Sequence, residues 1–136
     1  MSDAKGAGQR PRPLSPHLQV WRWHLTLACS ILHRATGVML YLGAIVGAAW
    51  AFSLASGPDA YGDFLVIIGS IIGKLFLFGL TFSAFYHLAN GIRHLAWDMG
   101  EGFEPKAADT TAAAALAVAG AATIAVWVIA ALTGGL

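Results

Sequence analysis

Two short polar stretches interrupt apolar sequence, and their side chains could hold a cofactor or a polar ligand. The first, residues 85–98 (FYHLANGIRHLAWD), contains His87, Arg93, His94 and Asp98. An α-helix turns about 100° and rises about 1.5 Å per residue, so His87, His94 and Asp98 share one face and Arg93 lies beside it. Charged and polar residues inside a membrane helix are costly, and they indicate a functional site.

The second stretch, residues 30–37 (SILHRATG), places Ser30, His33, Arg34 and Gly37 at spacings of three and four, again on one helical face. If the first helix begins on the side of the membrane where the second one ends, the two faces meet at the same depth. Together they supply three histidines, two arginines, one serine and one aspartate near one membrane surface.

His87 is the candidate for binding iron. It lies about two turns, roughly 10 Å, deeper than His94, and a neutral imidazole with no nearby acid suits an axial haem ligand. Gly91, one turn away, leaves an open face for a flat macrocycle. His33, Arg34 and His94 would then meet the haem propionates, because cations at that depth neutralise carboxylates. Six-coordinate iron needs a second axial ligand, which another subunit would have to supply.

Ser30 and Arg34 suit a different ligand, a quinone. A quinone has two carbonyl oxygens, and in a dry pocket each of them needs a hydrogen-bond donor. Asp98, at the aqueous end of its helix, could pass protons to such a ligand or pair with Arg93.

Simpler roles stay open for all of these residues. A single deep histidine such as His87 can make a hydrogen bond between helices. Arg34 and Arg93 fit positively charged anchors at the cytoplasmic surface. Ser30 can bond its own backbone, and Asp98 fits a plain surface residue at a helix end.

The composition places these residues in a membrane protein. Of 136 residues, 57% are hydrophobic and 11% are charged, whereas soluble domains carry about 25% charged residues. The net charge of +1 says nothing about nucleic acid, and no basic cluster is dense enough to suggest nucleic-acid binding. The one cysteine, Cys29, predicts a buried apolar residue rather than a disulfide or a metal site.

Three apolar stretches are long enough to cross a bilayer, which takes about 20 residues. Residues 112–132 carry no charge, and residues 35–54 form another span. Residues 64–95 are too long for a single crossing. Because a lysine at mid-bilayer costs about 3 kcal/mol, Lys74 is expected at an interface, with residues 64–73 outside the membrane core.

The sequence therefore predicts an all-α membrane protein with three transmembrane helices. Residues 1–27 are expected to form an N-terminal cytoplasmic or interfacial segment. The predicted membrane helices are residues 28–56, residues 64–97 (which include an outer extension) and residues 112–133. Residues 98–111 form the predicted cytoplasmic loop between the second and third helices. Lysine and arginine gather before the first span, and the second loop has Lys106, whereas the first loop and residues 133–136 have neither. The positive-inside rule thus puts the N-terminus in the cytoplasm and the C-terminus in the periplasm.

Three motifs in combination resemble the cytochrome b556 subunits of succinate dehydrogenase, respiratory complex II. They are RPLSPHLQVWRW at residues 12–23, SILHRATG at residues 30–37 and HLANGIRHLAWD at residues 87–98. The resemblance covers residues 12–100, and the three-span layout fits the rest. It implies a membrane anchor that shares one haem b with a second, smaller anchor subunit in a two-subunit helical bundle.

The resemblance also implies a four-subunit enzyme that passes electrons from succinate to ubiquinone. A flavoprotein subunit with FAD oxidises succinate to fumarate, and an iron–sulfur subunit with its clusters carries the electrons. The N-terminal residues 12–17 would lie under the iron–sulfur subunit. This chain has no flavin or dinucleotide fingerprint and no cysteine cluster, so succinate oxidation belongs to its partners.

By resemblance, His87 is the haem iron ligand, and the other axial histidine belongs to the second anchor. Ser30 and Arg34 line the ubiquinone pocket, and Asp98 lies near the quinone. Three residues lie near the haem propionates: His33, Arg34 and His94.

Three alternatives remain: the anchor of a related fumarate reductase, a haem-free quinone-binding anchor, and a purely structural anchor. The N-terminus lacks the apolar core of a secretory signal, and it is short and poor in arginine for a transit peptide. These features favour the inner membrane of a bacterium, with the mitochondrial inner membrane as the alternative.

Overall fold

The computed structural model describes residues 22–135, and its regular structure there is entirely helical. Four helices follow one another: α1 (Leu25–Ser56), α2 (Pro58–Gly69), α3 (Ile71–Asp98) and α4 (Pro105–Leu132). Helices α1, α3 and α4 are long and apolar enough to cross a membrane. This confirms the predicted all-α membrane protein with three membrane-spanning helices.

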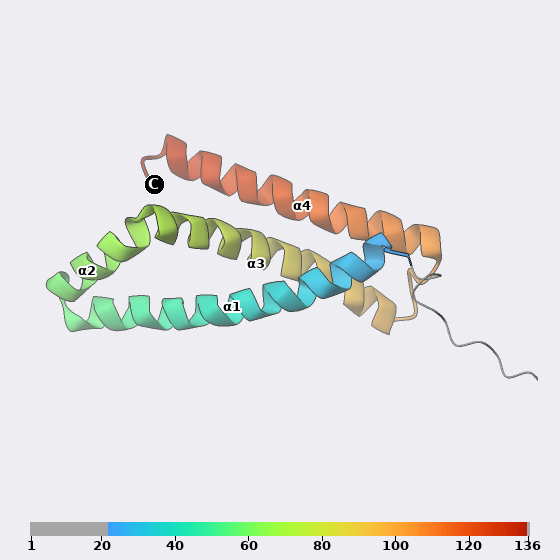
Figure 1. Cartoon of the computed structure of the whole chain (residues 1–136), viewed down its shortest axis with the longest axis horizontal. Coiled ribbons are helices and arrows are strands. Elements are labelled where there is room, and N and C mark those ends of the chain that lie inside the picture. Colours follow the sequence, from blue (N-terminus) through green and yellow to red (C-terminus); the bar gives the residue numbers. More distant parts are fainter. Residues whose placement is uncertain (1–21, 136) are drawn as a thin grey trace, which may run out of the picture.

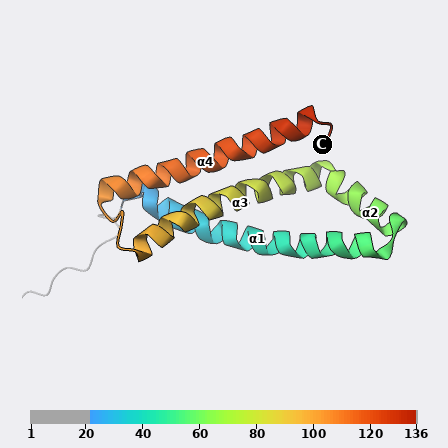
Figure 2. The same cartoon turned by 180° about the vertical axis from the view of Figure 1, so that it is seen from behind.

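Helix α3 packs between α1 and α4, and the short α2 joins α1 to α3 at one end of the molecule (Figures 1 and 2). The C-terminal end of α4 lies at that same end. The beginning of α1, the end of α3 and the beginning of α4 lie together at the opposite end. The two polar stretches of the sequence therefore reach the same end of the bundle.

Two helices begin earlier than the expected spans. Helix α1 begins at Leu25 rather than at residue 28, and α4 begins at Pro105 rather than at residue 112. Proline suits the first helical turn, because its missing N–H would have no intrahelical partner there. The segment expected under the iron–sulfur subunit, residues 12–17, lies outside the described residues.

The expected element 64–97 consists of parts of two helices, because the chain turns at Ser70. Ser70 has an extended backbone (φ −63°, ψ 162°), and its hydroxyl oxygen accepts a hydrogen bond from Gly73 N at 3.1 Å, which caps α3. Glycine is required at position 73, because a Cβ there would overlap the carbonyl oxygen of Ile68. Lys74 consequently lies in the first turn of α3.

The core of the described chain is small and lies along α3. Tyr86 is fully buried against Cys29 of α1 and against Ala112 and Ala119 of α4. Its hydroxyl donates to the carbonyl oxygen of Cys29 at 2.9 Å. Cys29 is buried, as predicted, and the alanines let α4 approach α3 closely. Many large apolar side chains point outward instead, toward positions that lipid or other subunits would cover.

Candidate functional site

Three imidazole rings from two helices lie together at the end of the bundle that both polar stretches reach. We call them the imidazole cluster: His33, His87 and His94. The ring of His33, on α1, lies on the ring of His87, on α3, with centroids 3.9 Å apart and planes 12° from parallel. The centroids of His33 and His94 are 5.0 Å apart. The two polar stretches therefore meet, as the sequence predicted.

Helix α1 holds the ring of His87 through one nitrogen. Its Nδ1 lies 3.2 Å from the carbonyl oxygen of His33 and 3.4 Å from the hydroxyl oxygen of Thr36. Thr36 donates its only hydroxyl hydrogen to the same carbonyl at 2.9 Å, so toward His87 it can only accept. Both neighbours are thus acceptors, which places the proton on Nδ1 and leaves the lone pair on Nε2.

Thr36 is a site residue that the sequence interpretation missed. Its side chain is buried, with 3% of its surface exposed. The signal that could have found it is its place in SILHRATG, three residues after His33. At that spacing a threonine hydroxyl reaches back to the carbonyl of the preceding turn, and its oxygen remains available to a neighbouring helix.

Two glycines, one on α1 and one a turn along α3 from His87, act differently. A Cβ on Gly37 would lie 3.3 Å from Cε1 of His87, which is tighter than ordinary packing allows. Glycine at position 37 therefore lets the imidazole lie against α1. A Cβ on Gly91 would meet nothing within 4 Å. Gly91 thus leaves an open surface one turn from His87, in agreement with the prediction.

The predicted quinone residues lie on successive turns of α1. Ser30 is half-buried and Arg34 is exposed, and neither side chain makes a hydrogen bond to another of the described residues. Asp98 is exposed at the last residue of α3, and within residues 22–135 no ion pair involves it. The donors of Ser30 and Arg34 and the carboxylate of Asp98 are therefore unused within this part of the chain.

Arg93 connects α3 to α4. Only 6% of its surface is exposed. Its Nε donates to Thr111 Oγ1 at 3.0 Å, its Nη2 to the carbonyl oxygen of Ala108 at 3.0 Å, and its Nη1 to Asn90 Oδ1 at 3.2 Å. The guanidinium carbon lies 4.0 Å from the centroid of the Trp97 ring. This cation is satisfied by neutral acceptors and by one aromatic face.

These contacts correct the two roles that the sequence suggested for Arg93, a surface anchor and a partner of Asp98. The side chain turns toward α4 instead, where a hydroxyl and a backbone carbonyl oxygen accept its hydrogen bonds. The ring of Trp97 also meets the ring of His94 edge to face, with centroids 5.0 Å apart. Arg93 therefore supports the imidazole cluster indirectly, because it packs on the ring of Trp97 and Trp97 packs on the ring of His94.

The side chains of this site suit the iron of a haem, to which this chain supplies one ligand, better than a metal ion whose ligands all come from this chain. Among residues 22–135, no group of three or more histidine, cysteine, aspartate or glutamate side chains could hold a metal ion. The side-chain nitrogens His33 Nδ1 and Asn90 Nδ2 are buried without a hydrogen-bond partner in that part of the chain. The cluster offers one oriented imidazole, His87, with the ring of His33 stacked on it and the ring of His94 tilted against that of His33.

Comparison with known proteins finds membrane subunits of succinate dehydrogenase and fumarate reductase. Residues 8–126 match the profile of a family described as "Succinate dehydrogenase/Fumarate reductase transmembrane subunit". The succinate dehydrogenase cytochrome b556 subunit of Rickettsia bellii is 39% identical over 94% of this chain and 100% of its own length. That of Paracoccus denitrificans is 37% identical over 78% and 82%. The mitochondrial cytochrome b560 subunit of Sus scrofa is 39% identical over 67% of this chain and 55% of its own length.

Proposed function

Because the chain belongs to the family of succinate dehydrogenase and fumarate reductase transmembrane subunits, we propose that its imidazole cluster holds one side of a b-type haem and that Ser30 and Arg34 line a ubiquinone site. The chain is a membrane-anchor subunit of succinate dehydrogenase, an enzyme complex in which its relatives are the cytochrome b subunits. The resemblance of its motifs to that family is thereby confirmed.

The observation that carries the haem proposal is the pair of acceptors around Nδ1 of His87. An imidazole that ligates iron through Nε2 normally donates its other N–H to a carbonyl, which fixes the ring and raises its basicity. The carbonyl of His33 and the hydroxyl of Thr36 supply this arrangement. The open surface at Gly91 leaves room beside it. When bound, haem b accepts and donates single electrons.

His87 would hold one side of the iron, and the second axial ligand would come from the second anchor subunit. His33, Arg34 and His94 remain the proposed partners of the haem propionates. The stacked position of His33 brings its ring closer to the axial imidazole than the sequence suggested. His33 therefore supports the ring of His87 as well as contributing to the propionate end of the site.

Ubiquinone is the proposed electron acceptor of the complex. Arg34 has a charged donor and Ser30 has a hydroxyl donor, and each can donate a hydrogen bond to one quinone carbonyl oxygen. The bond from Arg34 should be the stronger one, because its donor is charged. Asp98 lies at the aqueous end of α3, where a carboxylate can relay protons that the reduced quinone takes up. Its exposure gives it access to water.

The proposed partners are a flavoprotein subunit with FAD, an iron–sulfur subunit with its clusters, a second membrane anchor, and membrane lipid. The proposed location is the inner membrane of a bacterium, with the N-terminus cytoplasmic and the C-terminus periplasmic. Relatives from Rickettsia and Paracoccus support the bacterial membrane, and the positive-inside rule supports the orientation. The mitochondrial inner membrane stays the alternative, supported by the relatives from mammals.

A difference spectrum tests the haem proposal. We would record dithionite-reduced minus oxidised spectra of the purified complex for wild type, His87→Ala and the control His24→Ala, whose imidazole is exposed just before α1. The α-band of a b-type haem should be lost or shifted only in His87→Ala. A band that His87→Ala leaves unchanged would place the iron elsewhere. If no sample has a band, the anchor is haem-free.

A further inference from the structure

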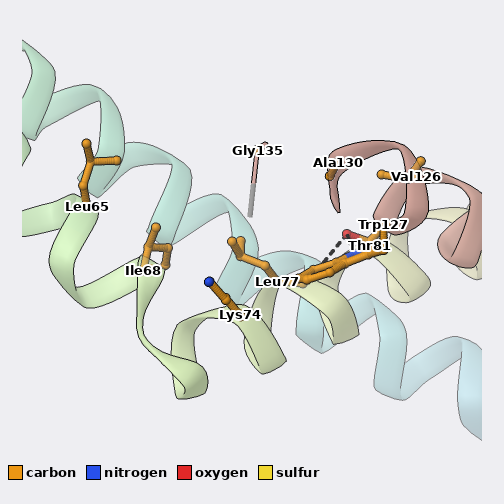
Figure 3. Close-up of a pocket in the computed structure, with 10 residues that line it drawn as sticks. Leu65, Ile68, Lys74, Leu77, Thr81, Val126, Trp127, Ala130 and Gly135 are labelled. Carbon is orange, nitrogen blue, oxygen red and sulfur yellow. Dashed lines mark hydrogen bonds between the residues drawn. The ribbon is translucent and has the colours of Figure 1, made fainter. Parts of the chain in front are cut away.

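A cavity lies at the end of the bundle opposite the imidazole cluster, between α2, the start of α3 and the end of α4 (Figure 3). Its volume is about 390 Å³. It lies beside the turn at Ser70, where α2 ends and α3 begins, and residues from the end of α4 also line it. Lys74 is about 20 Å along α3 from His87, by helical rise, so the cavity is separate from the proposed haem site.

The walls are mostly apolar, and Lys74 is the one charged residue among those that line the cavity. Its side chain runs beside Leu77 and turns toward Ile68 (Figure 3). Within residues 22–135, no carboxylate lies within ion-pair distance of its ammonium group. A cavity with apolar walls and a few placed polar groups is typical of a site for an organic ligand.

The other polar groups of the cavity are already paired. Trp127 Nε1 donates to Thr81 Oγ1 at 3.3 Å, and Thr81 donates in turn to the carbonyl oxygen of Leu77 at 2.7 Å. The ring of Phe78 packs edge to face on Trp127, with centroids 5.3 Å apart. The indole is therefore held in place and forms one wall of the cavity, and among residues 22–135 the ammonium of Lys74 has no counter-charge.

We propose that this cavity holds one anionic phospholipid, with its phosphate against Lys74 Nζ and an acyl chain along Leu77, Val126 and Trp127. Lys74 lies in the first turn of a membrane-spanning helix, which is the depth of lipid headgroups. An anionic headgroup would neutralise Lys74, and an acyl chain would pack against the apolar walls, so an anionic phospholipid supplies both. A zwitterionic lipid fits less well, because its own ammonium competes with Lys74 for the phosphate.

Two other occupants fit the chemistry less well. A quinone is uncharged and would leave the charge of Lys74 without a counter-ion in an apolar setting. An inorganic phosphate ion would neutralise Lys74 but would leave the apolar walls without contacts. The proposal does not depend on the haem or quinone sites, and it can fail while they stand.

Native mass spectrometry of the purified complex, reconstituted in nanodiscs of phosphatidylcholine with one-fifth phosphatidylglycerol, tests it. Loss of one cation near an anionic lipid surface weakens binding by about fivefold, so Lys74→Gln should retain about one-fifth as much phosphatidylglycerol at this site. Lys74→Arg should retain it as wild type does. The control Lys106→Gln removes an exposed cation at the start of α4 and should change nothing.

A second variant keeps the cation and fills the space. Ala130→Phe should displace the lipid, because Ala130 lines the cavity beside Trp127 (Figure 3). Equal retention of phosphatidylglycerol by wild type, Lys74→Gln and Ala130→Phe would overturn the proposal. So would equal retention of phosphatidylcholine, release of the bound molecule by inorganic phosphate, or a bound mass that corresponds to a quinone.

Discussion

The ring of His33 lies nearly parallel to the ring of His87, at a centroid distance of 3.9 Å. Stacking covers one face of the His87 ring, while the acceptors around Nδ1 fix its rotation. A ligand that binds through Nε2 therefore meets a ring that is already oriented, and binding costs little further side-chain entropy.

Thr36→Val keeps the shape of the side chain but removes the oxygen that accepts from His87 Nδ1. Loss of such an outer partner typically costs a metal site ten- to a hundredfold in affinity or activity. We expect haem occupancy to fall by about tenfold under dilution, measured as haem per complex by the pyridine haemochrome method. Thr36→Ser, which keeps the hydroxyl, should remain near wild type. Full occupancy in Thr36→Val would mean that the His33 carbonyl alone holds the ring.

Gly37→Ala adds a methyl group where a Cβ would lie 3.3 Å from Cε1 of His87. The imidazole must shift by a few tenths of an ångström, so we expect altered electron paramagnetic resonance g-values and a changed haem midpoint potential. Gly47→Ala is the matched control on the same helix, because its Cβ would meet nothing within 4 Å. Identical spectra for Gly37→Ala and Gly47→Ala would show that the close approach is not needed.

Arg93→Met should destabilise the complex, because Asn90 Oδ1, Thr111 Oγ1 and the carbonyl of Ala108 all lose a charged donor. A hydrogen bond to a charged group contributes about 2 kcal/mol, so the loss should be of at least that size. The measurement is the midpoint of thermal inactivation of the purified complex.

Arg93→Lys should not restore that midpoint, since one ammonium cannot reproduce the fork geometry of a guanidinium. Lys106→Met serves as the control, because it removes an exposed cation near the same loop. A midpoint for Arg93→Met equal to that of Lys106→Met would refute the bracing role of Arg93.

Ser30→Ala and Arg34→Ala should weaken quinone reduction without impairing succinate oxidation. We expect the KM for ubiquinone to rise by about tenfold for Arg34→Ala, the effect of losing one charged hydrogen bond. Ser30→Ala should have a smaller effect. Succinate oxidation with an artificial acceptor that bypasses the membrane subunits should be unchanged. Reduced assembly with unaltered quinone kinetics would instead favour a purely structural anchor.

The three long helices could be predicted because charge is costly in lipid, so gaps between charges mark membrane spans. The break at Ser70 was harder, since residues 64–95 read as one apolar run. Its local signal was a serine placed to cap the helix that begins with Ile71. Apolar composition says where a membrane span can lie, but it does not say where the backbone bends.

The candidate site shows the same division. Helical spacing correctly put His87 and His94 on one face, because that relation lies within a single helix. The offset between α1 and α3 depends on packing, so the stacking of His33 on His87 could not be read from spacing. Arg93 was misread for a similar reason, because its acceptors at residues 108 and 111 belong to another helix.

Helix α4 supplies no candidate ligand, yet it supports the wall behind the imidazole cluster. Ala112 and Ala119 are fully buried against α3, and two acceptors of Arg93, Ala108 O and Thr111 Oγ1, lie within the turn just before Ala112. A larger side chain at either alanine would push α4 away from α3 and take the acceptors at residues 108 and 111 with it, so that Arg93 on α3 would lose its support. An inherited substitution in the most featureless part of this sequence could therefore impair electron transfer while leaving every cofactor-binding residue intact.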